Sequence, residues 1–490
     1  KNNFIHEYSI SPTTFSYQLP NKNSNLDDIT IAPNPLSYLF DNTGTETSYS
    51  NQLFINKLNL DVKNRKITSV RPRNLKLTSK SFIDDSLYNP NYGYFNNNDV
   101  EIFHLDKPFD YAELKDIDEF LDTWEKKYDK YSSTNRNNLQ LWHTPTELFQ
   151  PYYGEAIARY LLVNYKLSYY PYHDLIIYEM GGGNGTLMLN ILDYIKRVDP
   201  EVYERTQYKI IEISSKLANK QRSQFVEQLL KLKSFNEHNS KIQIINKSIF
   251  DWDKRVGDPC YFLALEVFDN FAHDIIRYNN LTGQPYQGYV VTDENGDFHE
   301  YFNPELDYYC DLFLRLRENG EYPQINKKKR SFKNSLRPAH PLDEFKFKKL
   351  FMNQVFPFRN QLSYCSEFIP TRLLEFFFIL KNFFPNHSLL SSDFNYLPNS
   401  IPSSYNGPVK RSYHDQVITA NTYMVNQGYF DIMFPTDFPL ISDLYRQING
   451  KVGKIESHEE FLTRWSDLER TTTKTGENPM TEFYKNVSFF

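Results

Sequence analysis

The stretch Leu175–Ile195 reads LIIYEMGGGNGTLMLNILDYI and predicts a strand, a tight turn and a helix. A β-branched and aromatic run, Leu175–Tyr178, is followed by the acidic Glu179 and by a glycine loop, Gly181–Gly185. After the loop, apolar residues recur at helical spacing. Glycine lets the backbone approach a ligand closely, and the start of a helix supplies free N–H groups. This arrangement is typical of a cofactor-binding loop.

The spacing of the glycines distinguishes between kinds of cofactor. A dinucleotide-binding loop needs G-x-G-x-x-G, but the sixth position is Thr186 when counted from Gly181 and Met188 when counted from Gly183. A phosphate-binding loop needs Gly-Lys-Ser/Thr, which this stretch lacks. An acidic strand end followed by G-x-G-x-G is the first motif of Rossmann-like S-adenosylmethionine-dependent methyltransferases. That cofactor carries no phosphate, and Glu179 can receive its cationic amino-acid part. The alternative is a glycine-rich turn in an ordinary α/β domain.

Two further strands are predicted downstream of the loop, and both are followed by polar residues. The strand Tyr208–Ile213 contains Glu212 near its end, where a carboxylate can accept hydrogen bonds from ribose hydroxyls. The strand Lys241–Asn246 is followed by Ser248 and Asp251, which are expected to border the adenine. These positions extend the predicted cofactor site beyond the glycine loop.

A fourth strand, Tyr261–Leu265, is followed by Glu266 and Asp269. Strands that alternate with helices over short gaps predict a parallel sheet, and ligands of such sheets bind beyond the carboxyl ends of the strands. Taken singly, each acidic residue at these ends is better explained as a helix cap or a surface group. The prediction of a site rests on the placement of all five acidic residues at the strand ends. They are Glu179, Glu212, Asp251, Glu266 and Asp269.

The composition limits the classes of function. A chain of 490 residues is too long for one compact core, so two or three modules are expected. The net charge of −6 disfavours nucleic acid as the main partner. The cysteines Cys260, Cys310 and Cys365 form no CxxC pair or zinc pattern, so no metal site is predicted and a reducing compartment is favoured. No apolar run approaches the roughly 20 residues that span a bilayer.

The predicted fold class is α/β, a Rossmann-like class I methyltransferase sheet with helical N-terminal and inserted segments. A hairpin over Arg277–Val291 with a turn at Gly283, a helix over Pro370–Phe383 and a strand over Ser388–Phe394 are expected to follow the first four strands. The aromatic segment Asn89–Phe95 is interpreted as a packed turn rather than a ligand-facing one. The predicted divisions are an Asn/Ser-rich N-terminal extension (1–70), an N-terminal helical region (71–170), a Rossmann-like cofactor-binding core (171–300), a helical insertion with a basic loop at 327–337 (301–385), return strands that complete the core (386–445) and a C-terminal tail (446–490).

Five groups of residues follow one another along most of the chain: Pro90 with Gly93-Tyr94-Phe95; Thr144-Pro145, Glu147, Gln150 and Gly154-Glu155; Glu179 with Gly181 to Leu187; Leu265 to Asp269; and Ser392-Asp393-Phe394. Together they resemble the MidA-like mitochondrial methyltransferases, whose animal members are complex I assembly factors. The resemblance runs from about residue 90 to residue 437, and the chain is similar to a fungal branch. One extra residue between Gln150 and Gly154 departs from the family pattern.

This resemblance implies an S-adenosylmethionine-dependent protein arginine methyltransferase in the mitochondrial matrix. The implied substrate is a core subunit of respiratory complex I, dimethylated symmetrically during assembly. On this interpretation Glu266 and Asp269 hold the acceptor guanidinium by bidentate hydrogen bonds, and Glu155 is a weaker candidate for the same pocket. The alternative is a methyltransferase-fold scaffold or assembly subunit without catalytic activity.

Overall fold

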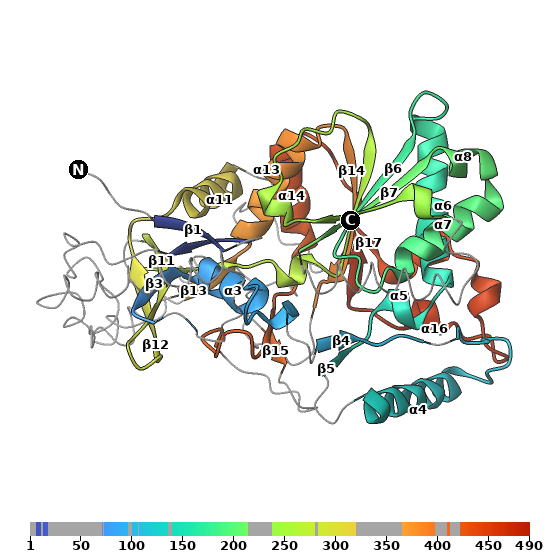
Figure 1. Ribbon diagram of the computed structural model, residues 1–490, viewed down its shortest axis with the longest axis horizontal. Helices are drawn as coiled ribbons and strands as arrows, with labels where there is room; N and C mark the ends of the chain where they lie inside the picture. Colours follow the sequence, from blue (N-terminus) through green and yellow to red (C-terminus); the bar gives the residue numbers. More distant parts are fainter. Residues whose placement is uncertain are drawn as a thin grey trace, which may run out of the picture.

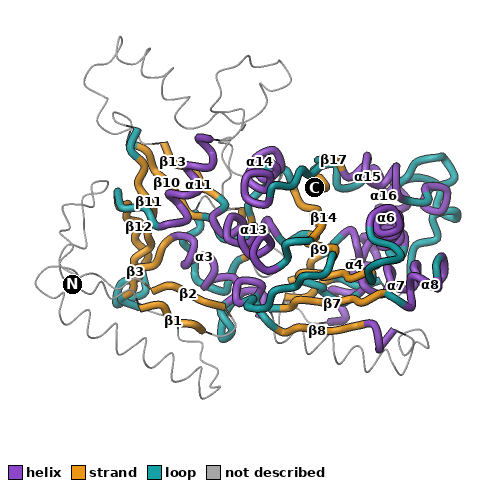
Figure 2. Tube along the Cα trace, turned by 90° about the horizontal axis from the view of Figure 1, so that it is seen from above, coloured by secondary structure: helices purple, strands orange, loops and turns teal. Residues whose placement is uncertain are grey.

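The computed structural model describes residues 6–10, 13–17, 71, 73–96, 100–105, 107–135, 140–213, 238–279, 283–319, 365–396, 409–411 and 422–490. Two β-sheets lie beside each other, with helices α3 (Ser79–Tyr88) and α13 (Thr371–Phe383) between them (Figure 1 and Figure 2). Most of the predicted cofactor residues belong to the larger sheet and to the loops at its edge.

The larger sheet has seven strands in the order β17-β18-β14-β9-β6-β7-β8. The strands β14, β9, β6, β7 and β8 are parallel, so their carboxyl ends meet at one edge. The strand β18 runs antiparallel to β14, and β17 runs antiparallel to β18. The predicted parallel sheet is therefore confirmed. The bounds are β6 (Leu175–Met180), β7 (Thr206–Glu212), β8 (Ile242–Asn246), β9 (Cys260–Leu265), β14 (His387–Phe394), β17 (Glu456–Ser457) and β18 (Val487–Phe489).

The two faces of the larger sheet carry separate cores because side chains alternate along each strand. Ile177 faces a core shared with α6 and α7, whereas Ile176 and Tyr178 face a core shared with α13 and α14. All six residues of β6 are buried, as expected for a central parallel strand covered on both faces. The covering helices are α6 (Tyr152–Ser168), α7 (Thr186–Val198), α11 (Tyr308–Asn319), α14 (Phe438–Asn449) and α15 (His458–Trp465).

The smaller sheet is antiparallel, with the order β12-β11-β10-β13 and with β3 paired to β11. It contains the predicted hairpin, whose turn residue Gly283 has a positive φ of 74°. The chain thus leaves the larger sheet after β9 and returns to it at β14. Residues 171–300, expected to form one core, are divided between two sheets. The bounds are β3 (Leu75–Thr78), β10 (Asp274–Tyr278), β11 (Pro285–Thr292), β12 (Phe298–Asn303) and β13 (Cys365–Ile369).

Residues 446–490 are an integral part of the larger sheet rather than the tail that we expected. They supply the strands β17 and β18, and α15 packs against α6. The Phe489 ring is buried and stacks on Phe461 with ring centroids 3.9 Å apart. Periodicity alone missed these strands because they are only two and three residues long.

Some expectations lie outside the described residues, namely the basic loop at 327–337 and all of the extension 1–70 except β1 (His6–Ile10) and β2 (Thr13–Tyr17). Within the described ranges, no helix combines the length and apolarity needed to cross a membrane. The remaining elements are η2 (Tyr94–Asn96), β4 (Val100–Ile102), α4 (Ile117–Asn135), β5 (Gln140–Trp142), α5 (Pro145–Leu148), α8 (Pro200–Glu204), η3 (Asn239–Lys241), η4 (Ile249–Asp251), η5 (Phe268–Asn270), β15 (Val409–Arg411), β16 (Asp431–Met433), η7 (Leu468–Thr471) and α16 (Pro479–Glu482).

Candidate active site

The glycine loop between β6 and α7 has a backbone that favours glycine at three positions. Gly181, Gly183 and Gly185 have φ angles of 70°, 49° and 81°, in the left-handed region that other residues rarely adopt. A Cβ atom on Gly182 would lie 2.9 Å from Cγ2 of Ile210, closer than packed atoms approach. The predicted strand, turn and helix are therefore confirmed, and the loop lies against the sheet.

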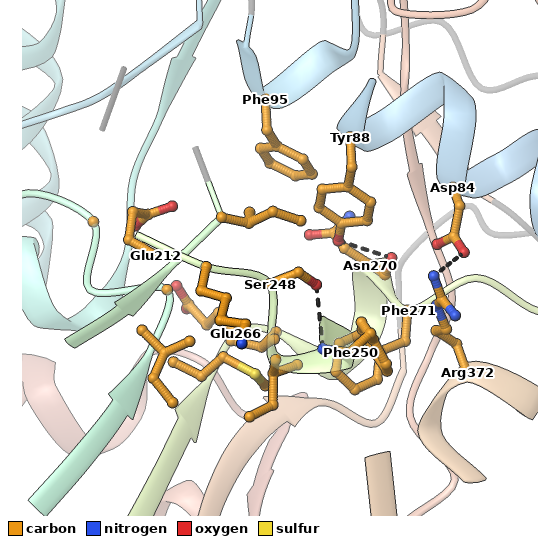
Figure 3. Close-up of a pocket in the computed structure, with 18 of the residues that line it drawn as sticks. Asp84, Tyr88, Phe95, Glu212, Ser248, Phe250, Glu266, Asn270, Phe271 and Arg372 are labelled. Carbon is orange, nitrogen blue, oxygen red and sulfur yellow. Dashed lines mark hydrogen bonds and ion pairs between the residues drawn. The ribbon is translucent and has the colours of Figure 1, made fainter. Parts of the chain in front are cut away.

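A cavity of about 200 Å³ lies beside this loop, at the carboxyl ends of β6, β7 and β9 (Figure 3). Its walls come from the loops of the larger sheet, from the N-terminal region around α3 and from the start of α13. The residues that line it are Asp84, Tyr88, Phe95, Ile102, Met180, Gly181, Gly183, Ile211, Glu212, Ile213, Lys247, Ser248, Ile249, Phe250, Glu266, Val267, Asn270, Phe271 and Arg372.

Five of the residues proposed from the sequence line the cavity: Gly181, Gly183, Glu212, Ser248 and Glu266. Glu212 ends β7 and is buried, and its backbone carbonyl accepts a 2.8 Å hydrogen bond from the Asn246 side chain of β8. The Ser248 hydroxyl accepts a 3.2 Å hydrogen bond from the N–H of Phe250, which shapes the loop after β8. The cavity is thus bordered by the segments assigned to the ribose and the adenine.

Glu179 lies next to the cavity without lining it. It is buried in β6, and its Oε2 accepts a 2.9 Å hydrogen bond from the Tyr208 hydroxyl of β7. Burial raises the pKa of Glu179 to about 7; the bond from Tyr208 opposes this shift and the nearby Glu212 adds to it. Its assigned role, reception of a cationic group, stays a prediction that requires the carboxylate to ionise.

Three further predicted residues are also absent from the cavity wall. Gly185 forms the end of the glycine loop and precedes the first residue of α7. Asp251 lies in the single turn η4, where its N–H bonds to the carbonyl of Ser248 at 3.1 Å. Asp269 is buried, and its N–H donates a 3.0 Å hydrogen bond to Oδ2 of Asp393 on β14. In the expected adenine-binding loop it is Ser248 rather than Asp251 that faces the cavity.

Glu266 is the residue whose geometry most suggests a function. It follows β9 with a φ of 54°, a left-handed conformation that costs a non-glycine residue about 1–3 kcal/mol and that clusters at functional sites. Its N–H donates a 2.7 Å hydrogen bond to the carbonyl of Ser392, which joins the ends of β9 and β14. Among the described residues, its buried Oε1 has no hydrogen-bond partner. Burial, and then the charge of Asp269, raise the pKa of Glu266 well above its ordinary value.

Glu155 requires a correction, because the structure places it outside the cavity. Its Oε1 accepts a 2.9 Å hydrogen bond from Arg197, and its Oε2 accepts another of the same length from Arg470. Both oxygens are therefore engaged in joining α6 to α7 and to the C-terminal segment. Nothing in the sequence indicated the direction of this side chain on α6, which leads to Arg197 in the last turn of α7 and to Arg470.

Several wall residues were not identified from the sequence, and they come from α3, from the turn after it and from α13. The rings of Tyr88 and Phe95 stack with centroids 5.4 Å apart, and the Tyr88 hydroxyl donates to the carbonyl of Asn270 at 3.1 Å (Figure 3). Phe95 belongs to the segment that we interpreted as a packed turn. That turn does pack, since Tyr94 is fully buried, but Phe95 also faces the cavity.

An ion pair closes another side of the cavity. Arg372 at the start of α13 bonds to Asp84 of α3 at 2.8 Å and to Glu375 at 2.6 Å. The Arg372 guanidinium lies over the Phe250 ring, 4.1 Å from its centroid. Burial raises the pKa of Asp84 to about 6 although Arg372 opposes the shift. This pair connects α3 to α13, and the contact with Phe250 links both to the loop after β8.

The residues present fit an S-adenosylmethionine-type ligand. Two left-handed glycines in the wall, Gly181 and Gly183, allow close approach of the ligand, a buried carboxylate stands at the end of β7, and Oε1 of Glu266 is a buried acceptor without a partner in the described part of the chain. The described wall offers Lys247 and Arg372 as cations, and both are engaged in ion pairs with Asp253 and Asp84. A ligand without phosphate groups suits such a wall.

Comparison with known proteins agrees with this geometry. The chain is 26% identical over 412 residues, 81% of its length and 80% of the relative's, to "Protein arginine methyltransferase NDUFAF7 homolog, mitochondrial" of Schizosaccharomyces pombe. It is 24% identical to the protein of the same name from Saccharomyces cerevisiae, with 69% of this chain and 77% of the relative covered. A solved COG1565 superfamily structure from Burkholderia thailandensis, bound to S-adenosyl-homocysteine, shares the fold with a TM-score of 0.51 at 11% identity, over 91% of this chain and 92% of that one.

A family described as "Putative S-adenosyl-L-methionine-dependent methyltransferase" matches residues 156–455, which is more than half of the chain. This range contains the glycine loop and the ends of β7, β8, β9 and β14. The match, the strand order and the loop geometry lead to the same conclusion: the chain belongs to this family of S-adenosyl-L-methionine-dependent methyltransferases.

Proposed function

We propose that this protein transfers a methyl group from S-adenosylmethionine to an arginine side chain of another protein. The observation that carries the proposal is the buried Oε1 of Glu266, which has no hydrogen-bond partner among the described residues and lies in the wall of the cavity that the glycine loop also lines. A guanidinium keeps its charge in proteins and presents a planar fork of N–H donors that matches a carboxylate. The names of the two fungal relatives support the same acceptor.

The cofactor is assigned to the half of the cavity formed by the larger sheet. Gly181 and Gly183 leave room for its amino-acid part, and Glu212 at the end of β7 accepts hydrogen bonds from the ribose hydroxyls. Ser248 and Phe250 border the adenine. Glu179 lies next to this half and balances the cationic ammonium group once its carboxyl ionises.

The acceptor is assigned to the rest of the cavity, whose wall includes Glu266 and the stacked rings of Tyr88 and Phe95 (Figure 3). A guanidinium bound to a carboxylate also interacts favourably with an aromatic face. The wall carboxylate Asp84 already pairs with Arg372, whereas Oε1 of Glu266 has no hydrogen-bond partner in the part of the chain that the structure describes and can accept one from an added cation. The wall therefore combines the two groups that recognise an arginine side chain.

The chemistry needs mainly positioning and charge balance. When bound, S-adenosylmethionine supplies a methyl group that its sulfonium already activates. Glu266 directs one guanidinium nitrogen along the line of transfer and stabilises the positive charge. As the N–C bond forms and the S–C bond breaks, the methylated nitrogen must lose one proton. The pKa of Glu266, raised by burial and by Asp269, makes its carboxylate a better acceptor for this proton than an exposed carboxylate.

We further propose a mitochondrial location, specifically the matrix, and a complex I core subunit as the protein substrate. Support for the compartment comes from the names of both fungal relatives, which specify mitochondria. Support for the substrate comes from the family resemblance of the motifs at residues 144–155 and 265–269. The net charge of −6 agrees with a protein rather than a nucleic-acid acceptor.

The proposal is tested by methyl labelling of mitochondrial extract from a strain that lacks this chain. Purified protein and S-adenosylmethionine with a labelled methyl group are added, and the labelled band is hydrolysed to its amino acids. We expect label in methylarginine, in a band that is absent without the added protein. Label in another amino acid contradicts the arginine assignment. No labelled band, despite tight binding of S-adenosylhomocysteine, favours the scaffold alternative.

A further inference from the structure

Glu147 occupies the third position of the short helix α5, after the N-cap residue Thr144. A Thr-x-x-Glu sequence commonly forms a capping box, in which the glutamate side chain returns to the N–H of the N-cap residue. Here one half of that box is present: the N–H of Glu147 donates to Oγ1 of Thr144 at 3.2 Å. The carboxylate of Glu147 is directed to other segments instead, so its position requires a different explanation.

Both oxygens of the Glu147 carboxylate contact residues outside α5. Oε1 accepts a 2.7 Å hydrogen bond from the Thr186 hydroxyl and a 3.0 Å bond from Nδ2 of Asn184. Oε2 lies 2.7 Å from Nδ1 of His104. The Glu147 residue is 2% exposed, so these bonds form away from water, where a lost partner is costly.

We propose that Glu147 is a positioning residue for the cofactor, which acts by holding the glycine loop in its binding conformation. Asn184 and Thr186 stand on either side of Gly185, the left-handed residue that precedes α7. A loop with three left-handed glycines has many alternative conformations, and ordering it costs entropy. Two hydrogen bonds to one buried carboxylate restrict those alternatives before the ligand arrives.

The same contact determines how the Asn184 amide is oriented. Nδ2 of Asn184 donates to Oε1 of Glu147 at 3.0 Å and to the carbonyl of Ile102 at 3.4 Å, so the amide nitrogen faces these two acceptors. The other atom of the amide, Oδ1, is then left as a buried acceptor without a partner among the described residues. Glu147 thereby presents a fixed acceptor on the loop that borders the cofactor. The inference deepens the proposed function and rests only on its cofactor-binding part.

The test measures binding of S-adenosylhomocysteine to the full chain by titration calorimetry, with thermal unfolding recorded for every variant. Glu147→Ala removes both loop bonds, whereas Glu147→Gln keeps an acceptor oxygen for Asn184 and Thr186. The matched control is Glu300→Ala, because Glu300 of β12 also accepts bonds from two side chains, Arg277 at 3.0 Å and Tyr423 at 2.9 Å. Glu300 does not line the cavity.

We expect Glu147→Ala to weaken binding about ten- to a hundredfold, the scale of lost hydrogen bonds to a charged group. Glu147→Gln should retain most of the affinity, and Glu300→Ala should lower the unfolding temperature without weakening binding. In turnover, the KM for S-adenosylmethionine should rise more than kcat falls. Wild-type affinity in folded Glu147→Ala, or an equal loss in Glu300→Ala, overturns the inference.

If Glu147→Ala does not fold, a variant of the glycine loop itself tests the inference. Thr186→Val removes one of the two bonds and leaves the carboxylate in place. It should weaken binding of S-adenosylhomocysteine several-fold, and unchanged affinity in this variant overturns the inference. A wild-type chain that does not bind S-adenosylhomocysteine at all contradicts the proposed function itself, so the two failures are distinguishable.

Discussion

The Tyr208 hydroxyl donates a 2.9 Å hydrogen bond to Oε2 of Glu179 across the neighbouring strands β7 and β6. Both side chains are buried, and Glu179 lies one residue before the end of β6, next to the edge of the sheet where the cofactor is assigned. The bond gives the carboxylate one partner, yet burial still raises the pKa of Glu179 to about 7 from an ordinary value of 4.5. The pKa of Glu179, the acidic residue that precedes the glycine loop, is therefore near neutral pH.

This pKa predicts a pH dependence of stability. Because the folded-state pKa is raised, the folded protein binds more protons than the unfolded chain between pH 4.5 and about 7, and stability attributable to Glu179 falls as the pH rises through that window. Across this window the free energy of unfolding attributable to Glu179 changes by about 3 kcal/mol at most. Urea unfolding of the wild type and of Glu179→Gln at pH 5 and pH 7.5 measures this change. The variant should lose less stability between the two pH values, and an identical loss in both proteins contradicts the pKa shift.

Gly183→Val should abolish binding of S-adenosylhomocysteine. The residue has a φ of 49°, which valine adopts with strain, and a Cβ atom would lie 3.1 Å from Cδ1 of Ile102 at the cavity wall. Gly257→Val is the matched control, because a Cβ atom there meets nothing within 4 Å. Calorimetry should show binding to the control only. Unchanged binding in folded Gly183→Val would remove the loop from the site.

Glu212→Ala should weaken binding of S-adenosylhomocysteine by about 1–3 kcal/mol, the usual cost of removing a charged hydrogen-bond partner. The loss should be smaller for a ligand whose ribose hydroxyls are removed, because those hydroxyls are the proposed donors. Glu204→Ala is the control, since the Glu204 side chain is exposed before β7 and pairs with Lys241. Equal losses for both ligands would place Glu212 away from the ribose.

The sequence predicted those parts of the site that follow directly from a strand end. Glu212 lies at the end of the apolar strand β7 and Ser248 two residues after the apolar strand β8, so their place at the carboxyl edge of the sheet follows from the parallel topology. Asp251 lies only three residues after Ser248, yet the turn η4 directs the wall through Ser248, Ile249 and Phe250 instead. Local turn geometry of this kind is not encoded in a spacing rule.

Other parts of the site arise from packing between distant segments. Asp84 and Arg372 are separated by 288 positions and meet because α3 and α13 lie together between the two sheets. The left-handed φ of Glu266 was equally unpredictable, since nothing in the sequence marks a non-glycine residue for that conformation. Glu155 illustrates the reverse error. It belongs to one of the residue groups that suggested the site, but packing directs its side chain to Arg197 and Arg470 instead.

The central claim is that Glu266 holds the arginine acceptor, and Glu266→Gln is the change that isolates it. The substitution keeps the shape of the side chain and removes the carboxylate that is proposed to pair with the bound guanidinium, so a large effect on transfer is electrostatic. Glu155→Gln is the control, because it makes the same change in a residue whose oxygens bond to two arginines outside the cavity. Both variants should bind S-adenosylhomocysteine as the wild type does.

The decisive measurement is the rate of arginine labelling in mitochondrial extract from the deletion strain, at saturating S-adenosylmethionine, for wild type, Glu155→Gln and Glu266→Gln. We predict a fall of about a hundredfold or more for Glu266→Gln, the scale seen when one electrostatic group is removed from an active site, and a rate close to wild type for Glu155→Gln. Labelling by Glu266→Gln at the wild-type rate would contradict the account.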